Sequence, residues 1–135
     1  MFYEISFKTL YYVFIILAIG IVPEAYPENL RLGYGKRSIG YHADGGVLYH
    51  GNKSGEKVGP KCNVGDRIGC GISFQRAGGM WGLFSLYDYF AVFTRNGRMI
   101  GQKVICTVSS RFLAVGMHSA GEKVKVILDA KMPGM

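Results

Sequence analysis

The stretch RIGCGISF, residues 67–74, alternates strictly between apolar side chains and small or polar ones. One face of the stretch carries Ile68, Cys70, Ile72 and Phe74, and the other carries Arg67, Gly69, Gly71 and Ser73. A period of two residues is that of a β-strand, because successive side chains point to opposite faces. The pattern predicts a half-buried antiparallel strand, with outward glycines that let other groups approach its backbone closely.

The segments on either side of this strand repeat the pattern of short apolar runs separated by turn residues. Further strands are expected over residues 38–41, 47–50, 87–94, 98–104, 112–118 and 122–128. Asp44-Gly45-Gly46 and Asn96-Gly97 are typical of tight hairpin turns, because their residues accept a positive φ. Residues 51–65 are predicted to be a loop, and no apolar stripe at helical spacing follows Val22. The predicted fold class is all-β, a sandwich of two antiparallel sheets.

Length and charge narrow the class of protein. The chain has 135 residues, which favours a single domain over residues 1–135 with a core spanning 2–128. Its net charge of +7 raises the question of nucleic-acid binding. The basic residues are spread along the chain, however, and Lys36-Arg37 is their densest pair. A solvated basic surface is the favoured interpretation, and nucleic acid is not an expected partner.

The number and placement of the cysteines indicate the redox state of the cellular compartment. The chain has three, at Cys62, Cys70 and Cys106, and no two of them form a CxxC pair. One thiol stays unpaired whatever the bridging, and Cys70 lies on the apolar face of its predicted strand. An odd number of core-like cysteines favours a reducing compartment over a disulfide scaffold, so we expect a cytoplasmic location.

The apolar run Leu10 to Val22 (LYYVFIILAIGIV) has two interpretations. It is shorter than the roughly 18 residues that a bilayer-spanning helix needs, and its Tyr, Val, Phe and Ile favour a buried strand. The alternative is a targeting helix of the secretory pathway, since Lys8 precedes the run and small residues lie near its end. The Asn-Lys-Ser sequon at Asn52 would be glycosylated only in a secreted chain. The buried strand is the favoured interpretation.

Several of these stretches, in this order, resemble the SPRY domain, the core of the B30.2 module. The motifs are Ala18-Ile-Gly-Ile-Val-Pro23, Ser38-Ile-Gly-Tyr-His-Ala-Asp44 with Leu48-Tyr-His50, Gly65-Asp-Arg-Ile-Gly-Cys-Gly71, Val92-Phe-Thr-Arg-Asn-Gly97 and Ala114-Val-Gly-Met-His118. The resemblance implies a bent sandwich that presents loops at one edge to peptide or protein partners. It also implies a substrate-recruiting, scaffold or adaptor role, without catalytic residues.

Two departures from the family pattern concern the N-terminal part. Family members usually have a polar, glycine-containing turn between the strands that resemble 2–7 and 18–22, whereas Lys8 to Leu17 is mostly apolar here. The hairpin is therefore expected to be distorted, unless the gene model is faulty. The chain also begins at the first of these strands, so a module that lacks one or more N-terminal strands is a second expectation.

No constellation of residues supports catalysis, a metal site or a cofactor. Gly116 to Lys123 only approximates a phosphate-binding loop, because Glu122 separates the glycine from the lysine. The three histidines have no finger or knuckle spacing with the cysteines. Asp44 and Asp66 each lie in a glycine turn, where aspartate usually bonds the backbone. We therefore expect no catalytic residue, no metal and no cofactor, and no enzymatic activity.

The expected partner-binding residues lie in loops, because a rigid sandwich positions its loops for recognition. They are Pro23, Tyr26, Pro27, Asn29, Tyr34, Lys36 and Trp81. Tyrosine and tryptophan supply large contact areas at low entropic cost, and Lys36 with Arg37 would steer an acidic partner. In the alternative interpretation, Tyr26 and Tyr34 pack over a sheet edge and Trp81 covers the core.

These observations favour a module that binds a protein or peptide partner through its loops. A secreted or membrane-tethered β-sandwich, which uses residues 10–22 as its signal or anchor, is the alternative. The membrane is a partner only under that alternative.

Overall fold

The computed structural model describes residues 2–7, 17–63, 65–76, 87–105, 111–117 and 124–127. Ten strands lie in these ranges: β1 Phe2–Phe7, β2 Leu17–Pro23, β3 Ile39–His42, β4 Val47–His50, β5 Glu56–Lys57, β6 Arg67–Arg76, β7 Tyr87–Arg95, β8 Arg98–Ile105, β9 Arg111–Met117 and β10 Val124–Ile127. No helix occurs within these ranges. The all-β prediction is confirmed.

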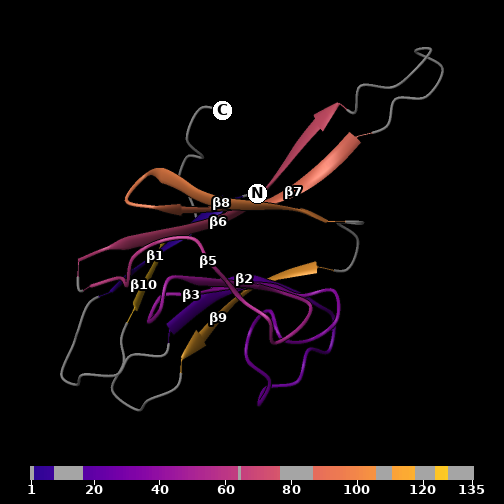
Figure 1. Ribbon diagram of the computed structural model, residues 1–135, viewed down its shortest axis with the longest axis horizontal. Helices are drawn as coiled ribbons and strands as arrows, with labels where there is room; N and C mark the ends of the chain where they lie inside the picture. The colour runs from indigo at the N-terminus through magenta and orange to yellow at the C-terminus, as the bar shows by residue number, and fades with distance from the viewer. Residues whose placement is uncertain are drawn as a thin grey trace.

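The strands form two five-stranded sheets, which Figure 1 shows as two stacked layers. Sheet A has the order β10-β1-β6-β7-β8, and sheet B has the order β5-β4-β3-β2-β9. Every neighbouring pair is antiparallel. Sheet-on-sheet packing buries the inner faces of both layers, which is the architecture of a β-sandwich.

Alternating side chains from both sheets meet in the core. From sheet A, Ile68 and Cys70 of β6 and Phe93 of β7 are fully buried. From sheet B, Ile19 of β2 and Tyr41 of β3 are equally buried and belong to the same cluster. The predicted apolar face of the stretch 67–74 is confirmed for its described side chains, because these residues point between the layers.

The strand β6 was predicted to be half-buried, and this is wrong for its middle, where the face opposite the core is buried as well. Gly69 and Gly71 are buried, and their register partners on β7, Thr94 and Val92, are 0% exposed. The strand lies in the centre of sheet A, and the second face of that sheet is covered here as well. A period of two residues reports which side chains share a face, and it does not report whether that face meets water.

The apolar N-terminal run contains a buried strand, as the favoured interpretation predicted. From Leu17 to Val22 every residue of β2 is buried, and Ile19 and Ile21 are 0% exposed. Residues 10–16 lie outside the described residues. Among the described residues, no helix has the length and apolar character that a membrane span requires.

The connection from β1 to β2 differs from the expected hairpin. β1 pairs with β10 and β6 in sheet A, while β2 pairs with β3 and β9 in sheet B. The two strands therefore belong to different sheets and do not pair with each other.

The turns follow their predicted chemistry. Gly46 closes the β3–β4 hairpin with a φ of 67°, and its N–H donates to the His42 carbonyl at 2.9 Å. Asn96 and Gly97 both have positive φ, at 51° and 83°, as a two-residue hairpin turn requires. Residues 51–65 were predicted to be a loop, but they also contain the short strand β5 at the edge of sheet B, which the prediction missed.

Candidate partner-binding pocket

The segment 24–38, between β2 and β3, covers the outer face of sheet B, on the side away from sheet A (Figure 1). Leu32 of this segment is 7% exposed and packs against Ala18 and Val22 of β2. Tyr26 and Ala114 of β9 complete this small apolar cluster. It is separate from the main core, and it holds the loop against the sheet.

The Tyr26 hydroxyl ties distant parts of the loop together. It donates a hydrogen bond to the Arg31 carbonyl at 2.6 Å and accepts one from the Gly35 N–H at 3.0 Å. The Ser38 hydroxyl lies 3.4 Å away and also bonds the Gly35 carbonyl. Because backbone groups of the loop have few partners in a sheet, this side chain replaces some of the bonds that regular structure would give.

His42 fixes the middle of the loop to the sheet. Its Nε2 lies 2.8 Å from the Leu32 carbonyl, so Nε2 carries the proton and donates. The ring stacks on Tyr34 at 5.6 Å between centroids and lies 4.5 Å from the ring of Tyr49. Burial lowers the pKa of His42 below its ordinary value of 6.5, although the Leu32 carbonyl and Asp44 act in the opposite direction. The neutral imidazole is therefore the form that holds the loop near neutral pH.

Gly40 lets the loop backbone approach the sheet directly. A Cβ at this position would lie 2.5 Å from the Leu32 carbonyl oxygen and 2.6 Å from its carbon. Such contacts are too close for any side chain, so glycine is the residue that this crossing requires. The motif Ser38-Ile-Gly-Tyr-His-Ala-Asp44 thus supplies both the glycine beneath Leu32 and the histidine that bonds it.

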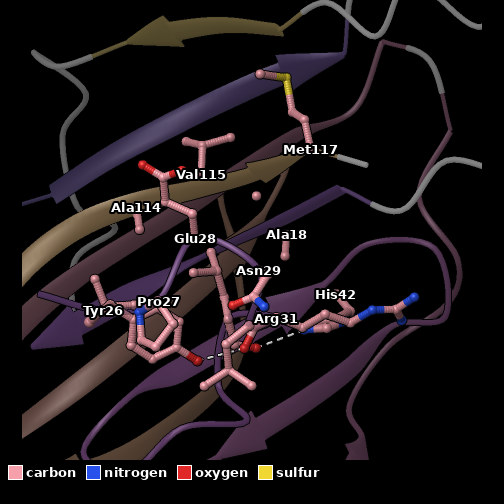
Figure 2. A pocket seen from close by; sticks show the side chains of 14 residues that line it. Ala18, Tyr26, Pro27, Glu28, Asn29, Arg31, His42, Ala114, Val115 and Met117 are labelled. Carbon is pink, nitrogen blue, oxygen red and sulfur yellow. Dashed lines mark hydrogen bonds between the residues drawn. The ribbon is translucent and has the colours of Figure 1, made fainter. Parts of the chain in front are cut away.

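A pocket of about 590 Å³ opens between this loop and β9 (Figure 2). Its floor is made of small or apolar residues of the two strands, namely Ala18, Val22, Ala114 and Gly116. Tyr26, Pro27 and Leu30 of the loop form one wall, and Met117 lies at the end of β9. The volume lies in the range of small-molecule and side-chain sites, and the lining is mostly apolar with polar groups at the rim.

Two charged residues of the loop, Glu28 and Arg31, line this pocket, and both are exposed. Figure 2 shows the Glu28 carboxylate and the Arg31 guanidinium pointing to opposite sides of the pocket. The rim therefore presents a negative group on one side and a positive group on the other.

The structure brings only part of the predicted site together. Tyr26, Pro27 and Asn29 line the pocket. Pro23 ends β2 and is half-buried, and Lys36 is exposed.

The Tyr34 ring packs against both His42 and Tyr49, whose rings also contact each other, as the alternative interpretation of a structural tyrosine supposes. Trp81 lies outside the described residues. The contact of these side chains with a partner stays a prediction.

Sequence reasoning missed Glu28 and Arg31 of the loop, and it missed the residues that the strands contribute, chiefly His42, Ala114, Gly116 and Met117. The small residues of β9 sit in the motif Ala114-Val-Gly-Met-His118, which was quoted only for its resemblance. Their alternation with Leu113 and Val115, which pack against the core, could have marked Ala114 and Gly116 as outward-facing.

A second polar cluster, around Asp66, is structural. Asp66 accepts bonds from the Asn63 N–H at 2.7 Å, from Asn96 at 3.0 Å and from Arg95 at 3.0 Å. Burial alone would raise the pKa of Asp66, but these bonds together hold it below its ordinary 3.8. As predicted, this carboxylate accepts a hydrogen bond from the backbone of its own turn. The described residues contain no cluster of His, Cys, Asp or Glu that could hold a metal ion.

Comparisons with known proteins agree with the fold and with the motifs. The family profile of the SPRY domain matches residues 10–78, about half of the chain. SPRY domain-containing protein 3 of Homo sapiens is 39% identical over 117 residues, which cover 86% of this chain and 25% of that protein. The Ran-binding protein M homolog of Arabidopsis thaliana is 33% identical over 110 residues, which cover 82% of this chain and 21% of that protein.

A crystal structure of a human SPRY domain superimposes with a TM-score of 0.76 and 34% sequence identity, covering 97% of this chain and 78% of that one. The chain spans a quarter or less of the two full-length relatives described above. The matched motifs, the two antiparallel sheets and the overlap with a solved domain lead to one conclusion. This chain belongs to the SPRY domain family.

Proposed function

We propose that this chain is a non-enzymatic module that binds an extended peptide or a protein segment in the pocket between the loop 24–38 and β9. The observation that carries the proposal is the pocket itself: an apolar floor on a rigid sheet, with a loop held above it by side-chain hydrogen bonds. A loop that is already ordered loses little conformational entropy on binding, which favours affinity.

The composition of the site supports a protein partner over a small metabolite. The pocket is lined by Tyr26, Pro27 and Met117, and the large apolar side chain of Phe112 is 52% exposed on the same strand as Met117. Aromatic residues and methionine are enriched where proteins meet. The SPRY family is a protein-interaction family, and two kinds of relative carry Ran-binding in their names.

We place the module in the cytoplasm, as a recruiting or scaffold component within a longer assembly. Cys62 and Cys70 are both buried, and Cys62 is not in a disulfide, as is usual for thiols in a reducing compartment. The competing proposal, a secreted or membrane-tethered domain, predicts cleavage near Gly20. Since Gly20 lies within the buried strand β2, N-terminal sequencing of the mature protein separates the two.

The test is selection of a random dodecapeptide display library on the immobilised full chain. Enriched peptides that are released by soluble chain support the proposal, and retention of nucleic acid alone, or of nothing, contradicts it. Replacing Pro27 and Asn29 together by alanine should weaken capture while the thermal midpoint stays unchanged, because both side chains are exposed. The matched control replaces Asn52 and Lys53, which are exposed in a turn that does not line the pocket.

A further inference from the structure

We propose that the pocket selects one sequence pattern: a bulky apolar side chain flanked on one side by a basic residue and on the other by an acidic residue. The inference rests on the proposed function and defines the chemistry of its partner. It follows from two independent features, the hollow in the floor of the pocket and the distribution of charge on its rim.

The hollow exists because small residues meet on neighbouring strands. Ala18 of β2 and Gly116 of β9 are register partners, and Ala114 lies two residues before Gly116 on the same face. Leu32 reaches the floor from the loop, since a Cβ on Gly116 would lie 3.5 Å from its Cγ and 3.6 Å from the Ala18 Cβ. A Cβ on Gly116 would therefore make only ordinary van der Waals contacts, and the pocket lies beyond them. A leucine, phenylalanine or tryptophan side chain of a partner would bury its apolar surface there.

The rim provides the flanking specificity. Among the described residues, neither the Glu28 carboxylate nor the Arg31 guanidinium has an ion pair or a side-chain hydrogen bond. They point to opposite sides of the pocket (Figure 2), so a partner that crosses it meets one negative and one positive group. A basic residue of the partner would be attracted to Glu28 and an acidic residue to Arg31, whereas the reverse placement would be repelled.

The charges on the rim therefore predict a different partner sequence from the one that the net charge predicts. With +7 overall, long-range attraction favours an acidic segment on both sides of the anchor. Glu28 opposes an acidic residue on its own side, because the contact is short and is screened less than distant charges are. A peptide with one basic and one acidic flank can place opposite charges beside both Glu28 and Arg31, and it can do so in either chain direction.

The test repeats the dodecapeptide selection on the full chain and on two charge variants. Peptides from the wild-type chain should share one Leu, Phe or Trp with a basic and an acidic residue on opposite sides. Glu28→Arg should shift the flanks to two acidic residues, and Arg31→Glu should shift them to two basic residues. For one synthetic peptide of the wild-type pattern, each variant should weaken binding about threefold, as exposed charge pairs do.

The hollow is tested by filling it. Gly116→Val adds methyl groups above an ordinary contact on a strand that accepts β-branched residues, so the fold should persist. It should weaken the wild-type peptide about tenfold or more, since the anchor loses its burial. Gly101→Ala is the control, because Gly101 on β8 has similar room, at 3.6 Å from Leu48 and 3.7 Å from Val58.

The outcomes are distinguishable. Peptides that lack an apolar anchor, flanks that do not change with Glu28 or Arg31, or binding that survives Gly116→Val would each overturn the inference and leave the proposed function standing. A library that yields no peptide at all counts against both. If Gly116→Val unfolds the chain, Gly116→Ala replaces it. This variant should keep its thermal transition and weaken the peptide by a smaller factor.

Discussion

The hydroxyl of Tyr26 should keep the loop 24–38 ordered in the absence of a partner. Tyr26→Phe keeps the ring that packs over Gly35 and removes only the oxygen that joins the Arg31 carbonyl to the Gly35 N–H. A hydrogen bond contributes about 0.5–1.5 kcal/mol net, and a partly buried donor left unpaired costs more. The Arg31 carbonyl is exposed and can turn to water, so we expect a total loss of about 1–2 kcal/mol.

Urea denaturation at neutral pH measures the global part of this loss as a lower midpoint with an unchanged slope. Hydrogen exchange measures the local part, because the Gly35 amide loses its acceptor and should exchange about tenfold faster. Tyr49→Phe is the control, since among the described residues no backbone group of the loop bonds its hydroxyl. An unchanged midpoint with unchanged exchange at Gly35 would show that the hydroxyl does not order the loop.

Three further predictions concern the same sandwich. Because burial lowers the pKa of His42, the unfolded chain takes up the proton first, so stability should fall as pH drops below about 6.5; His42→Gln should flatten this dependence in denaturant titrations across pH 5–8. Gly40→Ala should cost about 1–3 kcal/mol of unfolding free energy and expose the loop to protease, because its methyl group would displace the Leu32 backbone; equal cleavage rates would refute this. Asp66→Asn should cost about 1–2 kcal/mol at pH 7. Because its hydrogen bonds hold the pKa of Asp66 below 3.8, wild-type stability is lost as the pH falls below that value and the carboxylate is protonated, so the difference between the two proteins should shrink; a difference that stays constant down to the lowest pH at which both fold would show that the charge of the carboxylate is not its source.

The fold was largely predictable because its determinants are local. Alternation over 67–74 identified the central strand β6, and the turn chemistry of Gly46 and of Asn96 placed two hairpins. The length of the apolar run ending at Val22 argued against a membrane span, and the buried strand β2 agrees with that. These features depend on periodicity and positive φ, which a sequence displays directly.

What could not be predicted is the arrangement of elements that are distant in sequence. The first two strands were expected to form a hairpin, but they lie in different sheets, and the local pattern does not report this tertiary pairing. The candidate site shows the same limit. The loop residues Tyr26, Pro27 and Asn29 were found from composition, whereas Ala114 and Gly116 arrive from β9, some 90 positions along the chain, through their pairing with β2.

The assignment of the binding site is tested most directly by amide exchange of the full chain with and without a peptide selected from the random library. Binding in the pocket predicts slowed exchange at residues 26–32 and 113–117, with the inner strand β7 unchanged. Slowed exchange confined to the turns at 63–66 and 96–97, or spread over sheet A alone, would contradict the assignment of the binding site to this loop and β9.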